Sequence, residues 1–233
     1  MIVVNKLAIM QPYFFPYIGY FQLMNAVDAF VIYDDVGFVK RSWINRNYIL
    51  AQGKKARFTL QLQGASQNVL INEVGVGLNK ARLLKTLRHA YSRAPEFEAV
   101  FPLIEEIMAS PNASLAEFLY FSLRRVCEWL GIDLKWYVSS SIKKDNSLKA
   151  QEKIIDICKS LGADHYVNLP GGRSLYDRNE FSNHGIQLSF IEPQLAEYQQ
   201  GIDGFVSGLS IIDVMMFNSR SRCKELLKGY SIV

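Results

Sequence analysis

The stretch that decides the fold is residues 7–35, LAIMQPYFFPYIGYFQLMNAVDAFVIYDD. It begins with a short apolar run at residues 7–10 and ends with a second at residues 29–33, and such runs are typical of buried strands. Between them lie a loop rich in Pro and aromatic residues, 11–20, and an apolar segment, 21–27, for which we expect a helix. A strand, loop, helix and strand in this order predict the start of a parallel α/β sheet.

The rest of the chain continues this pattern around a helical middle. Further strands are expected at residues 57–62, 70–74, 134–138, 164–167 and 187–191. Helices are expected at residues 80–92, 97–109, 115–130, 148–161, 177–183 and 209–218. We therefore expect an α/β fold with a Rossmann-like, mostly parallel sheet. It would form a single domain over residues 1–233, with a helical insertion or subdomain at roughly residues 78–131.

Composition excludes several classes of protein. Hydrophobic residues make up 49% of the 233 residues, which argues against disorder. The net charge is only +4 and the Lys and Arg residues are scattered, so no basic stripe for nucleic acid is present. The three cysteines, Cys127, Cys158 and Cys223, lack the spacing of a zinc site or a disulfide framework. The sparse cysteines indicate a reducing, cytoplasmic location. We expect no transmembrane segment, because no apolar run approaches about 20 residues.

The loop at residues 11–20 is the first candidate site. Ligands of parallel α/β sheets bind at the carboxyl ends of strands, where this loop begins. The Gln11 amide can both donate and accept hydrogen bonds, and Tyr13 and Tyr20 could form a stacking floor. The alternative is a rigid corner of Pro and aromatic residues packed on the core, and the two interpretations are compatible.

The segment after the second strand, residues 34–46, is the second candidate site. It combines two acids, three cations, an aromatic ring and an amide: Asp34, Asp35, Lys40, Arg41, Trp43, Asn45 and Arg46. Paired carboxylates can act as a general base, bind an amine or hold Mg²⁺. Cations and an amide can bind phosphates, and a Trp ring can stack on a base or sugar. The alternative is a surface loop with an incidental mixture of charges.

Residues 168–176 form a third candidate, because a Gly-containing loop follows a strand and precedes a helix. Gly171 and Gly172 would let backbone N–H groups approach an anion, and Arg173 would add charge. Tyr176 is the nearest proton donor in sequence. An ordinary tight turn is the alternative.

A fourth candidate lies near the C-terminus, where Tyr198 and Gln199 precede an apolar helix that contains Asp213 and is followed by Asn218. A buried Asp needs a cation, a cap or a ligand as its partner. A structural salt bridge or cap is the alternative to a ligand site.

These motifs resemble the hallmark of the WbqC-like protein family. The resemblance rests first on residues 10–21 (MQPYFFPYIGYF), then on Asp28, Asp34-Asp35 and residues 40–46 (KRSWINR). Shorter similar pieces follow over nearly the whole chain: Tyr91, Ala94-Pro95, 161–164, 170–172, Tyr198-Gln199, 209–213 and 217–218. The chain departs from the family where Leu169 replaces a Gly and where Ser219-Arg220 replace Cys-Gly.

The resemblance implies a transferase that acts in bacterial surface polysaccharide biosynthesis, such as that of O-antigen and lipopolysaccharide. An acyl or aminoacyl group, for example glycyl, would move to the amino group of a nucleotide-linked amino sugar. The donor would be an activated thioester, such as that on the phosphopantetheine of an acyl carrier protein, and no further cofactor or metal is expected. A homo-oligomer is compatible with the sequence.

On this interpretation several of the candidate residues have a specific role. Asp34 or Asp35 would bind or deprotonate the amine, while Gln11 and Asn45 would orient the reacting groups. Four cations would hold the phosphates of the sugar nucleotide or of the carrier: Lys40, Arg41, Arg46 and Arg173.

Two other functions remain open from the sequence. The first is a nucleotide-dependent ligase or nucleotidyltransferase, although the chain lacks the histidines of the HIGH motif. The second is a non-catalytic sugar-nucleotide-binding or scaffold protein. A hydrolase is least favoured, because His89, His165 and His184 have no triad-like context and no GxSxG, Walker A, GxGxxG or HExxH motif is present.

Overall fold

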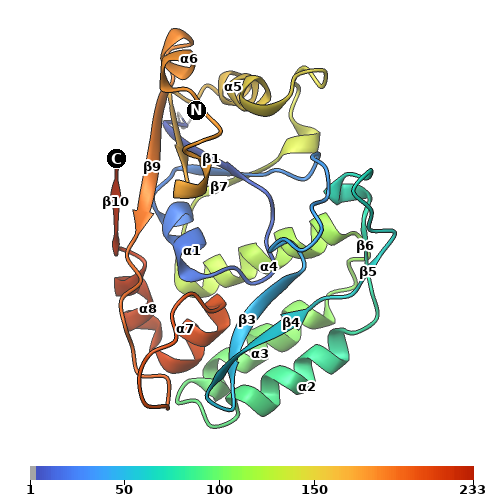
Figure 1. Cartoon of the computed structure of the whole chain (residues 1–233), viewed down its shortest axis with the longest axis vertical. Helices are drawn as coiled ribbons and strands as arrows, with labels where there is room; N and C mark the ends of the chain where they lie inside the picture. The colour runs from blue at the N-terminus through green and yellow to red at the C-terminus, as the bar shows by residue number, and fades with distance from the viewer. Residues whose placement is uncertain (1–3) are drawn as a thin grey trace.

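A computed structural model describes residues 4–233 as a mixed α/β fold around one twisted central sheet (Figure 1). Its strand order is β10-β9-β8-β1-β2-β7. The strands are β1 (Lys6–Met10), β2 (Ala29–Ile32), β7 (Lys135–Val138), β8 (His165–Asn168), β9 (Gln187–Pro193) and β10 (Tyr230–Ile232). All neighbours pair in parallel except β10, which runs antiparallel to β9 at the edge. The predicted Rossmann-like sheet is therefore confirmed.

Helices cover both faces of the sheet, which explains why its central strands are apolar without alternation. On one face Ala8 and Phe30 pack in the same core as α1 (Ile18–Asn25) and α4 (Leu115–Leu130). On the other face Leu7 and Val31 pack with α5 (Ala150–Leu161) and α6 (Arg178–Asn183). Among residues 4–233, no helix is both long and apolar enough to cross a membrane.

The remaining elements lie largely beside the first of these faces (Figure 1). The helices are α2 (Lys80–Tyr91), α3 (Phe97–Ala109), α7 (Ile211–Phe217) and α8 (Arg220–Leu226). The strands are the hairpin β3 (Arg46–Ala51) and β4 (Lys54–Thr59) and the short pair β5 (Leu62–Gln63) and β6 (Gly75–Val76). The 3₁₀ turns are η1 (Ile71–Glu73), η2 (Ser139–Ser141) and η3 (Pro170–Gly172).

Several element boundaries differ from the sequence prediction. Residues 70–74 are not a strand but include the turn η1, because the Glu73 carboxylate accepts a hydrogen bond from the Leu70 N–H at 2.7 Å and folds the segment back. The sequence prediction does not include strand β3, whose first residue, Arg46, is the last residue of the predicted cationic segment. Helix α4, in contrast, is capped as predicted: Ser114 Oγ accepts from the Glu117 N–H, and Gly131 ends the helix with φ of 75°.

The sheet has its topological switch point between β1 and β8. From β1 the chain adds β2 and β7 on one side, and later β8 and β9 on the other. The loops that leave the carboxyl ends of β1 and β8 therefore diverge in opposite directions and leave a crevice between them. In open α/β sheets this crevice is where ligands bind.

Candidate functional site

A cavity of about 650 Å³ occupies the switch point, and we call it the central cavity. It is lined by Ile9, Met10, Gln11, Tyr13, Tyr17, Tyr33, Trp43, Asn168, Leu169, Pro170, Gly171, Gly172, Leu175 and Tyr176. It therefore joins the loop after β1, the end of β2 and the loop after β8. The first and third candidate segments of the sequence meet here, together with Trp43 of the second.

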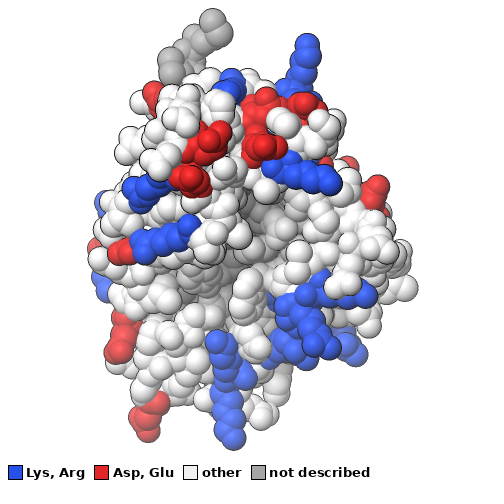
Figure 2. All heavy atoms as spheres, turned by 45° about the horizontal axis from the view of Figure 1, so that its top comes forward, with Lys and Arg blue, Asp and Glu red and all other residues white. Residues whose placement is uncertain are grey.

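The lining of the central cavity is aromatic and amide-rich. No Asp, Glu, Lys or Arg side chain is among its described lining residues, whereas Gln11 and Asn168 supply amides. Trp43 and Leu175 line it while remaining 46% and 66% exposed, so apolar side chains stand at its rim. The face shown in Figure 2 is hollowed near its centre, and a large group of Lys and Arg side chains lies below the hollow. The cavity itself suits a ring that stacks and accepts hydrogen bonds.

The Pro and aromatic loop is a rigid corner as well as a cavity wall. Phe14 and Phe15 are fully buried, and Asn47 Nδ2 and Ser210 Oγ donate to the Phe15 carbonyl at 2.7 Å and 2.8 Å. Phe15 has φ of 41°, a left-handed conformation that costs a non-glycine residue on the order of 1 kcal/mol or more. The surrounding contacts hold this strain beside the cavity, as is common at functional sites. Both interpretations of this loop are thus present together.

Tyr20 lies in the core rather than in the cavity. It is fully buried, and its hydroxyl donates to the Gln11 carbonyl at 2.7 Å. Burial raises the pKa of Tyr20 well above its ordinary value, so the phenol stays protonated as a donor. Its contact fixes the backbone of Gln11, whose side chain lines the cavity, while Tyr13 packs against the Tyr20 ring with centroids 5.4 Å apart.

Asn168 is a lining residue that the sequence reasoning did not select. It ends β8 and is only 5% exposed, and its Oδ1 accepts from the Leu169 N–H at 2.7 Å. A Cβ atom at Gly172 would lie 2.5 Å from Asn168 Nδ2, so glycine is needed for the amide to keep this position. Its sequence position carries a signal that could have identified it, because Asn168 is a polar residue directly after a predicted strand beside the switch point. Tyr17 and Tyr33 are further lining residues that were not selected.

Asp34 faces a different cavity. This second cavity, of about 760 Å³, lies at the carboxyl ends of β2 and β7. It is lined by Ile32, Asp34, Leu70, Asn72, Glu73, Ser114, Ala116, Glu117, Tyr120, Val138, Ser140 and Ser141. The Asp34 carboxylate is 3% exposed and accepts from the Ser140 N–H at 2.9 Å, the Ser140 hydroxyl at 2.6 Å and the Asn72 amide at 3.2 Å. Tyr33 and Asp34, consecutive in sequence, thus line different cavities.

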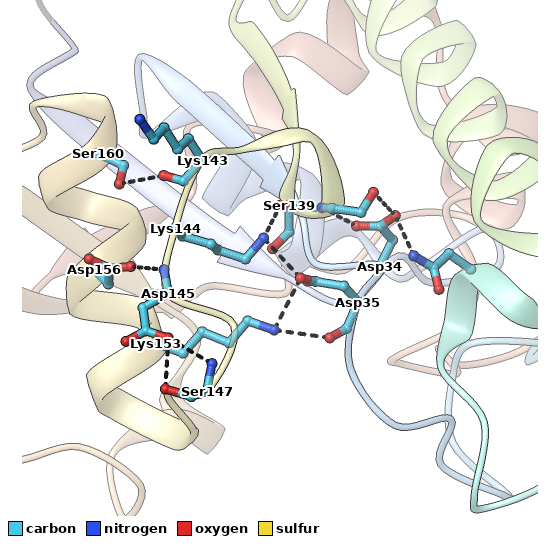
Figure 3. A network of polar contacts seen from close by, with 12 residues as sticks. Asp34, Asp35, Ser139, Lys143, Lys144, Asp145, Ser147, Lys153, Asp156 and Ser160 are labelled. Carbon is cyan, nitrogen blue, oxygen red and sulfur yellow. Dashed lines mark hydrogen bonds and ion pairs between the residues drawn. The ribbon is translucent and has the colours of Figure 1, made fainter.

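Asp35 is held in a buried ionic cluster (Figure 3). Its Oδ2 lies 2.9 Å from Lys144 Nζ and 3.1 Å from Lys153 Nζ. Burial acts to raise the pKa of Asp35, but the Ser139 side chain and the two ammonium groups together lower it below its ordinary value. The carboxylate is therefore ionised at neutral pH, and it lines neither cavity.

The predicted phosphate-binding residues lie outside the central cavity. Lys40 and Arg41 are exposed on the loop that precedes Trp43, and Arg46 begins β3. Asn45 Nδ2 donates to the Leu60 carbonyl at 2.8 Å and so joins the loop to the β3–β4 hairpin. Arg173 forms a surface ion pair with Glu192 at 2.6 Å. The acids, cations and aromatic loop that were expected around one hollow are therefore only partly brought together.

The fourth candidate segment forms a separate buried network. Asp213 is fully buried and accepts from Tyr91 Oη at 2.9 Å, Tyr198 Oη at 2.8 Å and Gln200 Nε2 at 2.7 Å. Burial raises the pKa of Asp213 in spite of these donors. Its partners are neutral, unlike the salt bridge considered from the sequence. Gln199 is exposed, and none of this segment lines the central cavity.

Asn218 is structural in its contacts, since its Nδ2 donates to the Val214 carbonyl at 2.9 Å. Within residues 4–233, no group of three or more His, Cys, Asp or Glu residues is placed to hold a metal ion.

Comparison with known proteins identifies the family of the chain. The model of the WbqC-like protein family matches residues 11–225. A Mycobacterium tuberculosis protein, named only as "Uncharacterized protein Rv1507c", is 28% identical over 229 residues, which are 96% of this chain and 98% of that protein. No solved structure matches. Because the family model covers nearly the whole chain, including the cavity-forming loops, the protein belongs to the WbqC-like protein family.

Proposed function

We propose that the protein transfers an acyl or aminoacyl group, such as glycyl, to the amino group of a nucleotide-linked amino sugar that binds in the central cavity. The observation that supports this most is the position and lining of that cavity. It lies at the switch point of a Rossmann-like sheet and combines five aromatic rings, from Tyr13, Tyr17, Tyr33, Trp43 and Tyr176, with two amides. Rings and amides are suited to stacking on a sugar or base and to hydrogen bonding its hydroxyls.

Acyl transfer requires few catalytic groups from the enzyme when the donor is already activated. The amine nitrogen attacks the thioester carbonyl carbon, a C–N bond forms, the C–S bond breaks, and the thiol leaves with a proton. Positioning and donors for the developing oxyanion are the main requirements. The amides of Gln11 and Asn168 supply donors in the cavity, and no nucleophilic Ser or Cys is required of the lining.

The amine also needs a group that accepts its proton. Asp34 directly follows Tyr33, and its cavity adjoins the same end of β2 as the central cavity. In this proposal the amino sugar extends across the end of β2, so that its ring contacts Tyr33 and its amine approaches Asp34. Lys40 and Arg41 are exposed and precede the lining residue Trp43 in the chain, and in this proposal they bind a phosphate or a carrier-bound donor. The setting would be cytoplasmic assembly of O-antigen precursors, with the donor on an acyl carrier.

A second candidate is a non-catalytic sugar-nucleotide-binding protein. It is favoured by one observation: no side chain that is ionised at neutral pH lines the central cavity among the described residues. Such a cavity can bind a ligand without acting on it.

Mass spectrometry separates these functions. The protein is incubated with UDP- and dTDP-linked amino sugars and with glycyl or acyl thioesters, with and without ATP. A sugar nucleotide heavier by the acyl group without ATP supports the transferase, and release of AMP or pyrophosphate would replace it with a ligase. Tight binding without turnover would favour the second candidate. Asn168→Ala should abolish most of the activity, whereas Asn183→Ala, an exposed residue of α6, serves as the matched control.

A further inference from the structure

The cluster around Asp35 contains more positive than negative charge. Lys144 and Lys153 both contact the same carboxylate oxygen, Oδ2 of Asp35. The two lysine side chains are only 1% and 11% exposed, and that of Asp35 is 11% exposed. Lys144 also donates to the Ser139 carbonyl, and Lys153 donates to the Asp35 carbonyl at 3.0 Å. One buried carboxylate thus faces two buried ammonium groups.

Three nearby acids, Asp34, Asp145 and Asp156, point away from the contact between Asp35 and the two lysines. Asp34 is turned toward the second cavity, where the Ser140 hydroxyl and the Asn72 amide bind it. Figure 3 shows Asp145 and Asp156 on the side of Lys144 that faces away from Asp35. Asp156 accepts the Asp145 N–H there at 2.8 Å, and Asp145 is exposed to solvent.

Tyr33 connects the cluster to the central cavity. Lys153 Nζ lies 5.3 Å from the centre of the Tyr33 ring, and Tyr33 lines the cavity. Strand pairing places Met10 beside this point, since the Tyr33 N–H donates to the Met10 carbonyl at 2.8 Å and Met10 also lines the cavity. A buried charge in a medium of low dielectric constant acts over a longer range than one on the surface, and salt screens it less.

We propose that Lys153, with Lys144, determines the charge selectivity of the central cavity, which favours a ligand that carries an anionic group such as phosphate. The cations act through the Tyr33 wall instead of touching the ligand. The inference rests on the proposed function only in taking the central cavity as the ligand site.

An engineered thiol in the cavity measures this preference without any ligand. Met10→Cys places a thiol beside Tyr33, and the native cysteines are buried. The rate of alkylation by iodoacetamide, measured below the thiol pKa, is proportional to the thiolate population. An ammonium group roughly 10 Å from a thiolate, at an effective dielectric constant of about 20 to 40, changes that population about fourfold to fifteenfold. Adding Lys153→Gln should therefore slow alkylation by about this factor.

Two further variants make the experiment decisive. Lys159→Gln removes an exposed lysine from the same helix and should leave the rate within about twofold of the parent, because surface charges are screened. Asp35→Asn removes the negative charge and should raise the rate, so the inference is tested even if Lys153→Gln fails to fold. Equal rates in the Lys153 and Lys159 variants, or no acceleration in Asp35→Asn, would overturn the inference. Because the assay contains no ligand, that result would leave the proposed transferase untouched.

Discussion

The close approach of Gly172 to Asn168 allows a single methyl group to test the central cavity. In Gly172→Ala the new Cβ would lie 2.5 Å from Nδ2 and 3.1 Å from Cγ of Asn168, and 3.2 Å from Cε2 of Tyr176. Such distances are too short to persist. Because the obstructing atoms belong to side chains, the Asn168 amide should rotate away and the backbone should remain in place.

The size of the effect follows from what the amide loses. Rotation breaks the hydrogen bond from the Leu169 N–H to Asn168 Oδ1, which contributes about 1 kcal/mol to stability. It also withdraws the Nδ2 donor from the cavity. Loss of a ligand hydrogen bond of about 1–2 kcal/mol corresponds to an affinity about 5-fold to 30-fold weaker. We therefore expect a small loss of stability and a larger loss of binding.

Gly37→Ala provides the matched control, because a Cβ there has no neighbour within 4 Å and Gly37 does not line the central cavity. Urea denaturation measures the free energy of unfolding of both variants, and calorimetric titration measures their affinity for the sugar nucleotide that the transfer assay selects. Gly172→Ala should be the weaker binder by about 5-fold or more, while Gly37→Ala stays within about twofold of the wild type. Equal affinities in the two variants would refute the reasoning about Asn168.

Three further predictions concern the residues around the cavities. Ser140→Ala removes the hydroxyl that donates to Asp34 and should lower the free energy of unfolding by about 1–2 kcal/mol in urea denaturation. Ser141→Ala, a change of the same size at the next position, which is exposed like Ser140, should cost less than about 0.5 kcal/mol. The pKa of Asp35 is lower in the folded protein than in the unfolded chain, so its carboxylate stabilises the fold above about pH 4, and this stabilisation is lost as the pH falls through the folded pKa. In urea denaturation at several pH values, the free energy of unfolding of Asp35→Asn should therefore decrease less on acidification than that of the wild type. Trp43→Ala should weaken ligand binding by about 2-fold to 10-fold in calorimetry with an unchanged free energy of unfolding, since the ring is 46% exposed at the rim; a large loss of stability would show instead that Trp43 is structural.

The opening of the sheet was predictable because of how parallel sheets are buried. Strands covered on both faces appear as short uninterrupted apolar runs, and both β1 and β2 have this pattern. Helix α1 begins at Ile18, three residues before the predicted start, directly after Pro16 and Tyr17. The general location of the site followed from the same rule, since ligands bind where parallel strands end.

The sequence predicts part of β4 but not β3, and the reason is local. Its turn, Gln52-Gly53, has φ of 51° and 72°, which suits a tight hairpin, but Gln is not among the residues that usually adopt this conformation. The preceding strand starts at Arg46, inside a segment whose mixture of charges indicated a loop. A mixture of charged residues does not exclude a strand, because side-chain charge and backbone conformation are independent here.

The internal arrangement of the site depends on where side chains point and on partners that are distant in sequence. Asp34 and Asp35 are adjacent in sequence, but one lines the second cavity and the other enters a cluster with Lys144 and Lys153. Those lysines lie more than 100 positions away along the chain, and scattered surface lysines look the same in a sequence. Adjacency in sequence therefore could not establish that the acids and the aromatic loop share one cavity.

The most direct test of the central claim is a crystal structure of the protein soaked with a nucleotide-linked amino sugar. The account predicts density for the ligand in the central cavity, with a ring against Tyr33 or Trp43 and hydrogen bonds to the amides of Gln11 and Asn168. An empty central cavity, with the same ligand ordered at another surface of the protein, would contradict it.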